Sequence, residues 1–158
     1  MPYPPQGIPI PPPVPPPSVG GGSQRLKCTI TDDILLQDPN LDTEVSTTQT
    51  FDILIHQITL NVVGSVRLYL ELRVDNPNAT AWASVQRNGV GIFGGLLFSS
   101  STTYEAKTLD INDCIEGDVI SIYLRVSPSG YTAYMRNVRL LGKVELLTET
   151  PIAARRDL

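Results

Sequence analysis

Histidine and cysteine are scarce in this chain of 158 residues, which has one histidine and two cysteines. His56 is distant in sequence from both Cys28 and Cys114, whereas zinc sites use closely spaced Cys and His ligands. We therefore expect no zinc centre and no cofactor. For the two cysteines we favour buried thiols, and a disulfide between them remains the alternative.

Long hydrophobic runs are also missing. No apolar stretch approaches 18 residues, so no membrane-spanning helix is expected. The first residues lack a basic segment followed by an apolar run, and we expect no secretory signal. The formal net charge of −4 disfavours a general nucleic-acid binder, which would be basic.

Charge is absent from the N-terminal segment, where no charged residue precedes Arg25, while ten of the 14 prolines lie in residues 1–22. Proline fixes φ and removes the amide donor, so residues 1–23 are predicted to form an extended arm whose first nineteen residues adopt polyproline II, with a reach of about 60 Å. Three consecutive glycines, residues 20–22, are predicted to act as a hinge. The sequence thus divides into an arm (1–23), a folded domain (24–149) and a C-terminal tail (150–158).

Aliphatic residues occur along the arm where a solvated spacer would carry polar ones. We predict that the arm anchors the domain to a partner surface, through Pro4, Pro5, Ile8, Ile10, Pro12, Val14, Pro16 and Val19. A passive spacer is the simpler alternative. A ligand for an SH3 or WW domain is disfavoured because the usual basic flank is missing.

Alternation of apolar and polar residues dominates the rest of the chain. It is clearest in Val66–Val74 and Ile120–Val126, each typical of a half-buried antiparallel strand. Weaker strands are expected at Leu26–Thr31, Val45–Ile55, Ile58–Val63, Thr80–Gln86, Gly91–Phe98, Thr102–Leu109, Thr132–Leu140 and Lys143–Leu147. The sequence therefore predicts an all-β protein, an antiparallel β-sandwich with a jelly roll as the favoured topology.

Turn and bulge signals fall between or within these strands. Asn88-Gly89 is the strongest hairpin signal, because a type I′ turn needs positive φ at both central residues. The phase of the alternation slips at His56-Gln57 and again at Arg136-Asn137, and both slips indicate β-bulges.

A family resemblance rests on several short motifs in order along the chain. They are the alternating strand from Val66, then Trp82 with Arg87-Asn88-Gly89-Val90, Thr102-Thr103-Tyr104, Gly117-Asp118 before Ile120, and Ala133-Tyr134 with Arg136-Asn137. This order, over about residues 64–141, resembles small jelly-roll proteins of tailed-phage and archaeal-virus virions (decoration, head-fibre and receptor-binding types) and related carbohydrate-binding modules. The resemblance implies a structural or adhesive role and carries over no catalytic residue.

Residues that could carry chemistry are few. The chain contains no phosphate-binding loop and no G-x-S-x-G motif, and we expect a non-enzymatic protein. Four carboxylates within nine residues are weak candidates for a Ca²⁺ site, with solvated turn residues as the favoured interpretation. They are Asp110, Asp113, Glu116 and Asp118.

Aromatic and arginine side chains are expected on the outward positions of the predicted strands, and these types are enriched at interface hot spots. The interface or glycan candidates are Arg67, Tyr69, Arg73, Trp82, Tyr123 and Arg125. We expect a virion structural protein, an accessory capsid decoration or fibre subunit assembled in the host cytoplasm, with copies of itself and/or a capsid or tail protein as partners. A glycan-binding receptor tip and an extracellular filament subunit are the alternatives.

Overall fold

The computed structural model describes residues 24–36 and 39–148, whose regular secondary structure is almost entirely β-strand. The first strands are β1 (Gln24–Leu36), β2 (Val45–Thr47), β3 (Ile53–Thr59), β4 (Gly64–Val74) and β5 (Thr80–Arg87). The later strands are β6 (Val90–Ser99), β7 (Glu105–Cys114), β8 (Val119–Ser127) and β9 (Ala133–Thr148). The one helix of the described part, α1 (Pro39–Asp42), has four residues.

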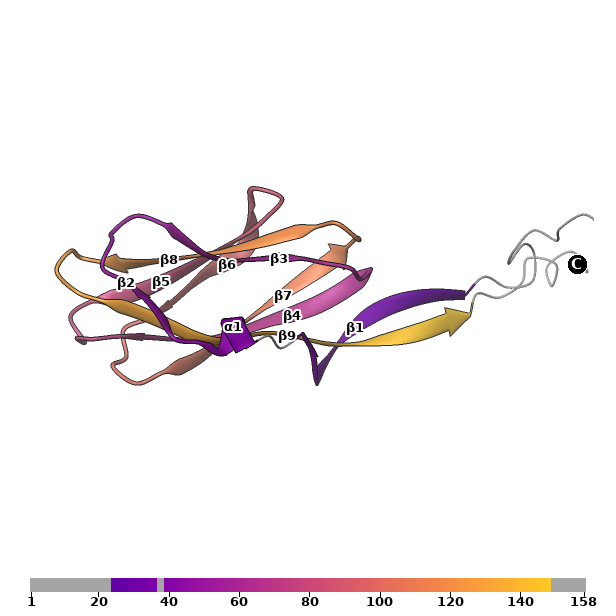
Figure 1. Ribbon diagram of the computed structural model, residues 1–158, viewed down its shortest axis with the longest axis horizontal. Helices are drawn as coiled ribbons and strands as arrows, with labels where there is room; N and C mark the ends of the chain where they lie inside the picture. The colour runs from indigo at the N-terminus through magenta and orange to yellow at the C-terminus, as the bar shows by residue number, and fades with distance from the viewer. Residues whose placement is uncertain (1–23, 37–38, 149–158) are drawn as a thin grey trace, which may run out of the picture. The chain divides into compact units, whose positions relative to one another are not determined.

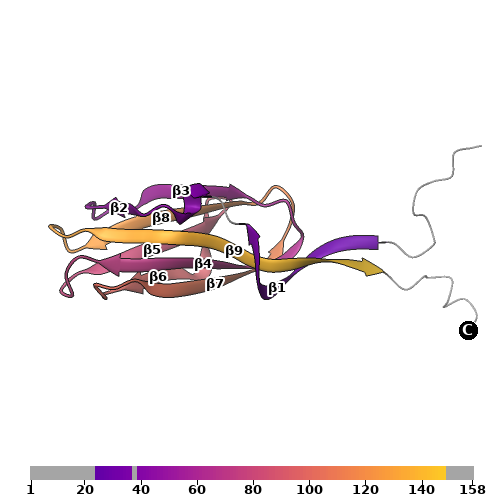
Figure 2. The ribbon, with the colours of Figure 1, turned by 60° about the horizontal axis from the view of Figure 1, so that its bottom comes forward.

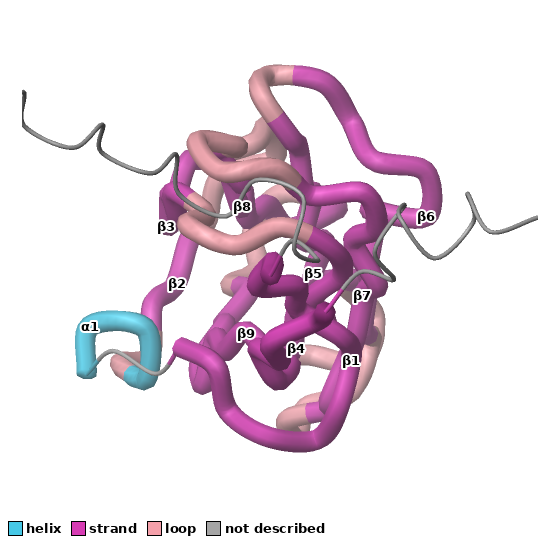
Figure 3. Tube along the Cα trace, turned by 90° about the vertical axis from the view of Figure 1, so that its right-hand side faces the viewer, coloured by secondary structure: helices cyan, strands magenta, loops and turns pink. Residues whose placement is uncertain are grey.

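The strands form two sheets that lie face to face (Figures 1 and 2). The five-stranded sheet has the order β2-β9-β1-β4-β7, and the four-stranded sheet has the order β3-β8-β5-β6. Figure 3 shows β2 and β3 at one edge of the sandwich and β6 and β7 at the opposite edge. The predicted all-β sandwich is confirmed.

The pairs β2–β9, β3–β8, β4–β7, β4–β9, β5–β6 and β5–β8 are antiparallel, whereas β1 and β4 are parallel. Strands β4 and β9 pair directly between Arg67–Leu141 and Val74–Ala133, and β1 comes between them in the sheet order. There β1 meets β4 in a parallel pairing, with Cys28 opposite Gly64. The sheet is therefore mixed, whereas the sequence predicted antiparallel pairing throughout.

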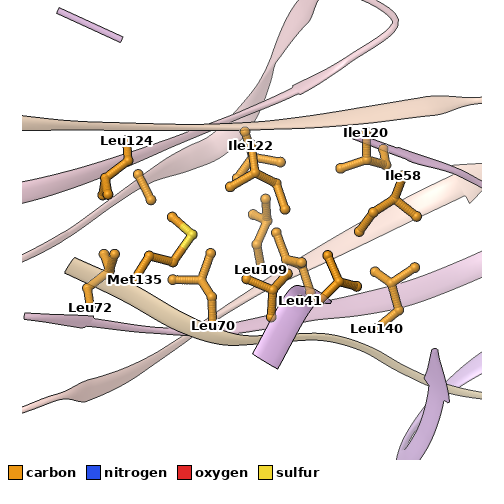
Figure 4. Packing of buried hydrophobic residues seen from close by; sticks show 14 of the residues in the cluster. Leu41, Ile58, Leu70, Leu72, Leu109, Ile120, Ile122, Leu124, Met135 and Leu140 are labelled. Atoms are coloured by element: carbon orange, nitrogen blue, oxygen red, sulfur yellow. The ribbon is translucent and has the colours of Figure 1, made fainter. Parts of the chain in front are cut away.

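The core lies between the inner faces of the two sheets (Figure 4). The apolar residues of the alternating patterns in β4 and β8 are completely buried, as predicted. They are Val66, Leu68, Leu70, Leu72 and Val74 in β4 and Ile120, Ile122, Leu124 and Val126 in β8. Burying one such aliphatic side chain contributes about 1.5–3 kcal/mol before the loss of conformational entropy is subtracted.

The predicted hairpin and both predicted bulges are present. Asn88 and Gly89 have φ values of 52° and 82°, which fits the type I′ turn that joins β5 to β6. The pairing of β3 with β8 shifts register between Leu54 and His56, one residue before the predicted slip. In β9 the shift occurs opposite Tyr69–Glu71, and Asn137 takes a φ of 54°.

Several strand boundaries differ from the predicted ones. The predicted strand Val45–Ile55 is split into β2 and β3, and the predicted strand Ile58–Val63 contributes only its first two residues, at the end of β3. Strand β7 continues to Cys114, because residues from Leu72 to Gly64 of β4 offer it a pairing partner along that length. Alternation of side chains could not reveal this partner.

The chain divides into two units. One comprises Met1–Arg25 with Leu147–Leu158, and the other is Leu26–Leu146. The sandwich belongs to the second unit. Of the first unit, the described residues are the outermost residues of β1 and of β9.

Both cysteines are buried free thiols, as favoured from the sequence. Cys28 and Cys114 are the pairing partners of Gly64 on its two sides. The Cα atoms of the two cysteines are therefore two strand spacings apart, about 9.6 Å. This exceeds the Cα separation that a disulfide tolerates. Burial raises the pKa of both thiols.

Candidate functional site

The predicted anchoring arm, which includes Pro4, Ile8, Ile10, Val14 and Val19, lies outside the described residues. The six predicted interface residues are all described. They do not form one surface.

The two sheets divide these six residues between opposite outer faces. Three belong to β4, on the five-stranded sheet, and they are Arg67, Tyr69 and Arg73. The other three belong to β5 and β8, on the four-stranded sheet, and they are Trp82, Tyr123 and Arg125. Outward alternation is confirmed for both sets, because the residues between them are buried.

On the five-stranded sheet, Glu71 is the centre of a hydrogen-bonded cluster. Its carboxylate accepts hydrogen bonds from Tyr69 Oη (2.7 Å), Arg136 Nε (2.7 Å) and Asn137 Nδ2 (3.1 Å). Burial alone would raise the pKa of Glu71, but these hydrogen bonds and the Arg136 charge together lower it. The bulge in β9 brings Asn137 to this position, so a local backbone irregularity completes the cluster.

A second cluster on the same face stacks arginines on tyrosines. The Arg73 guanidinium lies 3.7 Å from the ring centroid of Tyr134 and 5.2 Å from that of Tyr104, and Arg136 lies 3.9 Å from the Tyr104 ring. The Tyr104 hydroxyl donates a hydrogen bond to Glu44. Burial, followed by this hydrogen bond, raises the pKa of Tyr104 to about 12.

The consequence is that Tyr69 and Arg73 are engaged within the molecule. Arg67 is engaged as well, since its guanidinium donates to Asp110 at 2.6 and 3.1 Å. These contacts connect Glu44, which directly precedes β2, and Asp110 of β7 to the central strands of the five-stranded sheet. A partner would have to compete with them.

The four-stranded sheet is different, because its outer face displays apolar side chains in two rows across neighbouring strands. In one row Trp82 is the pairing partner of both Phe98 and Arg125. The Trp82 and Phe98 ring centroids are 5.2 Å apart, and the Arg125 guanidinium lies 5.2 Å from the Trp82 centroid. Arg125 also forms an ion pair with Asp52 at 3.6 Å.

The second row contains Leu54, Tyr123, Ser84 and Leu96, which are successive pairing partners across β3, β8, β5 and β6. Leu96 and Phe98 are 51% and 54% exposed, although both are large apolar residues. We call the two rows the aromatic face, defined by Leu54, Trp82, Leu96, Phe98, Tyr123 and Arg125. Contiguous exposed apolar surface of this kind is typical of a binding surface.

Sequence reasoning missed the β6 contribution because β6 departs from simple alternation. Ser84 pairs with Leu96 and Gln86 pairs with Gly91, so the four residues 92–95 lie opposite Val85 alone. Gly94 has a φ of 77°, and a Cβ on Gly95 would lie 2.8 Å from the Ile92 carbonyl oxygen. The adjacent glycines were the available signal, since glycine inside a strand often marks a bulge.

This four-residue excursion presents Phe93 to solvent, with the side chain fully exposed. Beside it lies a cavity of about 420 Å³. The cavity is lined by Arg87, Val90, Gly91, Ile92, Phe93, Asp110, Asn112 and Asp113.

The four carboxylates considered as a Ca²⁺ site are not gathered around one point. Asp110 is paired with Arg67. Asp118 accepts hydrogen bonds from the Ile115 amide (3.0 Å) and Asn88 Nδ2 (2.9 Å), and the Ile115 bond is the main cause of its lowered pKa. Asp113 and Glu116 are exposed. Within residues 24–36 and 39–148, no three acidic, His or Cys side chains are arranged to hold a metal ion.

An apolar groove of about 480 Å³ opens at a different place on the second unit. We call it the aliphatic groove. Its lining residues are Leu26, Cys28, Leu35, Leu36, Ile58, Thr59, Leu60, Asn61, Val62, Val63, Glu116, Leu140 and Val144.

Comparison of the chain with models of protein families gave no match, and comparison with curated protein sequences gave none either. Among the helices of the described segments, none is long and apolar enough to cross a membrane. The function is therefore inferred from the residues and surfaces described above.

Proposed function

We propose that this chain is a non-enzymatic structural protein of a virion, an accessory capsid decoration or fibre subunit. In this proposal the sandwich is a jelly roll, and the Pro-rich arm anchors it to copies of itself or to a capsid or tail protein. The protein assembles in the host cytoplasm and ends in the virion.

The strand pairing supports the jelly-roll description. Four antiparallel pairs, β2–β9, β3–β8, β4–β7 and β5–β6, are nested around the hairpin at Asn88-Gly89. A long antiparallel ribbon folded over itself into two sheets is the topology of jelly rolls, which include viral capsid and lectin domains. Because a fold alone does not select a function, the proposal depends on the outer surface.

The observation that carries the proposal is the aromatic face. Trp82 and Phe98 form a contacting ring pair beside exposed Leu96, and this combination suits the centre of a protein interface better than a solvated surface. Arg125 lies over the Trp82 ring. A sugar stacked on that ring face would have to displace the guanidinium, so the face favours a protein partner over a glycan.

The test uses sedimentation velocity on the full chain over a range of concentrations. We expect self-association that is lost when residues 1–22 are deleted and weakened by Phe98→Ala, while thermal unfolding of both variants stays close to wild type. Ile115→Ala is the matched control, because Ile115 is 61% exposed and is not part of the aromatic face. A full chain that stays monomeric would contradict anchoring to copies of itself, and an arm deletion that associates normally would contradict the anchoring role of the arm.

A glycan-binding receptor tip is the second candidate, and the cavity beside Phe93 is the observation that favours it. An accessible aromatic ring there adjoins the carboxylate of Asp113 and the side chain of Asn112, groups that can hydrogen-bond to hydroxyls. On a glycan array, binding by the wild type that is lost in Phe93→Ala and kept in Ile115→Ala would select this function.

A further inference from the structure

The aliphatic groove has a buried floor and an exposed rim. Cys28, Ile58, Leu60 and Leu140 form the floor, with exposures between 0% and 7%. Figure 4 shows Ile58 and Leu140 near each other at one end of the core. The rim includes Leu26, Val63 and Val144, which are 60%, 45% and 38% exposed.

The lining chemistry restricts what the groove can bind. Nine of the thirteen lining residues are Leu, Ile or Val, and the one charged residue among them is Glu116. An occupant gains by bringing apolar groups and loses by bringing charges or backbone donors that would remain unpaired when buried. The groove therefore fits an uncharged apolar chain segment with few N–H groups.

The chain itself contains such a segment outside the described residues. Residues 1–23 precede β1, carry no charged side chain and include ten prolines, none of which has an amide hydrogen to satisfy. Ile8, Ile10, Val14 and Val19 supply aliphatic side chains along it. A proline-rich segment also loses little conformational entropy on binding, which is why such segments are recognised in apolar grooves.

We propose that the aliphatic groove receives the Pro-rich arm of a second copy of this chain. This inference rests on the proposed function, in which the arm makes contacts between molecules. Because the arm and the groove are different surfaces, each copy offers one of each, and the contact is heterologous. Such contacts close into rings or continue as open chains.

The experiment pairs two full-length variants that damage complementary halves of the contact. Val14→Asp places a charge in the arm, and Val63→Asp places one at the groove rim. We expect each variant alone to self-associate about tenfold more weakly than wild type or worse, as for loss of an interface anchor. An equimolar mixture should form one-to-one complexes, because the intact arm of Val63→Asp can enter the intact groove of Val14→Asp.

Controls separate this inference from the proposed function. Val90→Asp adds the same charge at a 69% exposed position outside the groove and should associate like wild type. Val144→Asp repeats the rim test in case Val63→Asp unfolds in a thermal melt. If Val14→Asp loses association while both rim variants keep it, the arm still anchors and the groove inference is wrong. If all variants associate normally, the anchoring role of the arm and the groove inference are both wrong. A mixture of Val14→Asp and Val63→Asp that forms no complexes also overturns the groove inference.

Discussion

Leu70 and Ile122 lie on central strands of opposite sheets, and neither side chain is accessible to solvent. We expect Leu70→Ala and Ile122→Ala each to lower the free energy of unfolding by about 2–5 kcal/mol, through lost burial and the cavity left behind. Leu54→Ala, at an exposed position of β3, should cost about 0.5 kcal/mol or less. Urea unfolding followed by circular dichroism measures all three, and a small effect in both core variants would contradict the packing described.

Glu71 provides a pH-dependent contribution at the same scale. Its pKa in the folded chain is lowered from an ordinary value of 4.5, so its ionised form stabilises the fold above about pH 4.5 and this contribution is lost as pH falls through the folded-state pKa. Glu71→Gln should therefore lower the Tm at pH 7 and lessen the further decrease toward pH 3. Glu145→Gln, at an exposed position of β9, is the control. Parallel Tm profiles for wild type and Glu71→Gln would show that the cluster contributes no pH dependence.

The excursion in β6 contains two glycines, Gly94 with a positive φ and Gly95 with backbone atoms packed closely against it. A Cβ on Gly95 would lie 2.8 and 2.9 Å from the carbonyl oxygens of Ile92 and Val85, whereas a Cβ on Gly91 would meet nothing within 4 Å. We expect Gly95→Ala to destabilise the fold by about 1–3 kcal/mol, because the backbone must shift, and Gly91→Ala to be close to neutral. Equal unfolding free energies for the two variants would mean that the excursion is not rigid.

Elements also show what the sequence could and could not predict. The alternation in β4 and β8 identified both strands and the correct buried side of each, since a period of two assigns faces unambiguously. It could not say that Arg73 and Trp82 belong to opposite outer faces, because each sheet has an outer side and alternation does not assign strands to sheets. The exposure of Phe98 depends on the excursion at residues 92–95, a three-dimensional detail that the glycine pair only hints at.

At the scale of the second unit, the two outer faces of the sandwich have different chemistry. The face of β4 and β9 keeps its charges in internal contacts around Glu71 and Tyr104. On the aromatic face Leu96 and Phe98 remain about half exposed. A sandwich with one self-contained face and one apolar face is suited to lie on a partner through a single side.

The nested pairing has a consequence for how the chain folds. Asn88-Gly89 joins β5 and β6 directly, whereas Val45 of β2 pairs with Met135 of β9, 90 residues further along the chain. Closing that distant pair first would cost the most loop entropy, but each inner pair brings the ends of the next pair together. Folding that starts at the central hairpin can therefore proceed outward by short steps, from β5–β6 through β4–β7 and β3–β8. In this order β2 and β9 are joined last.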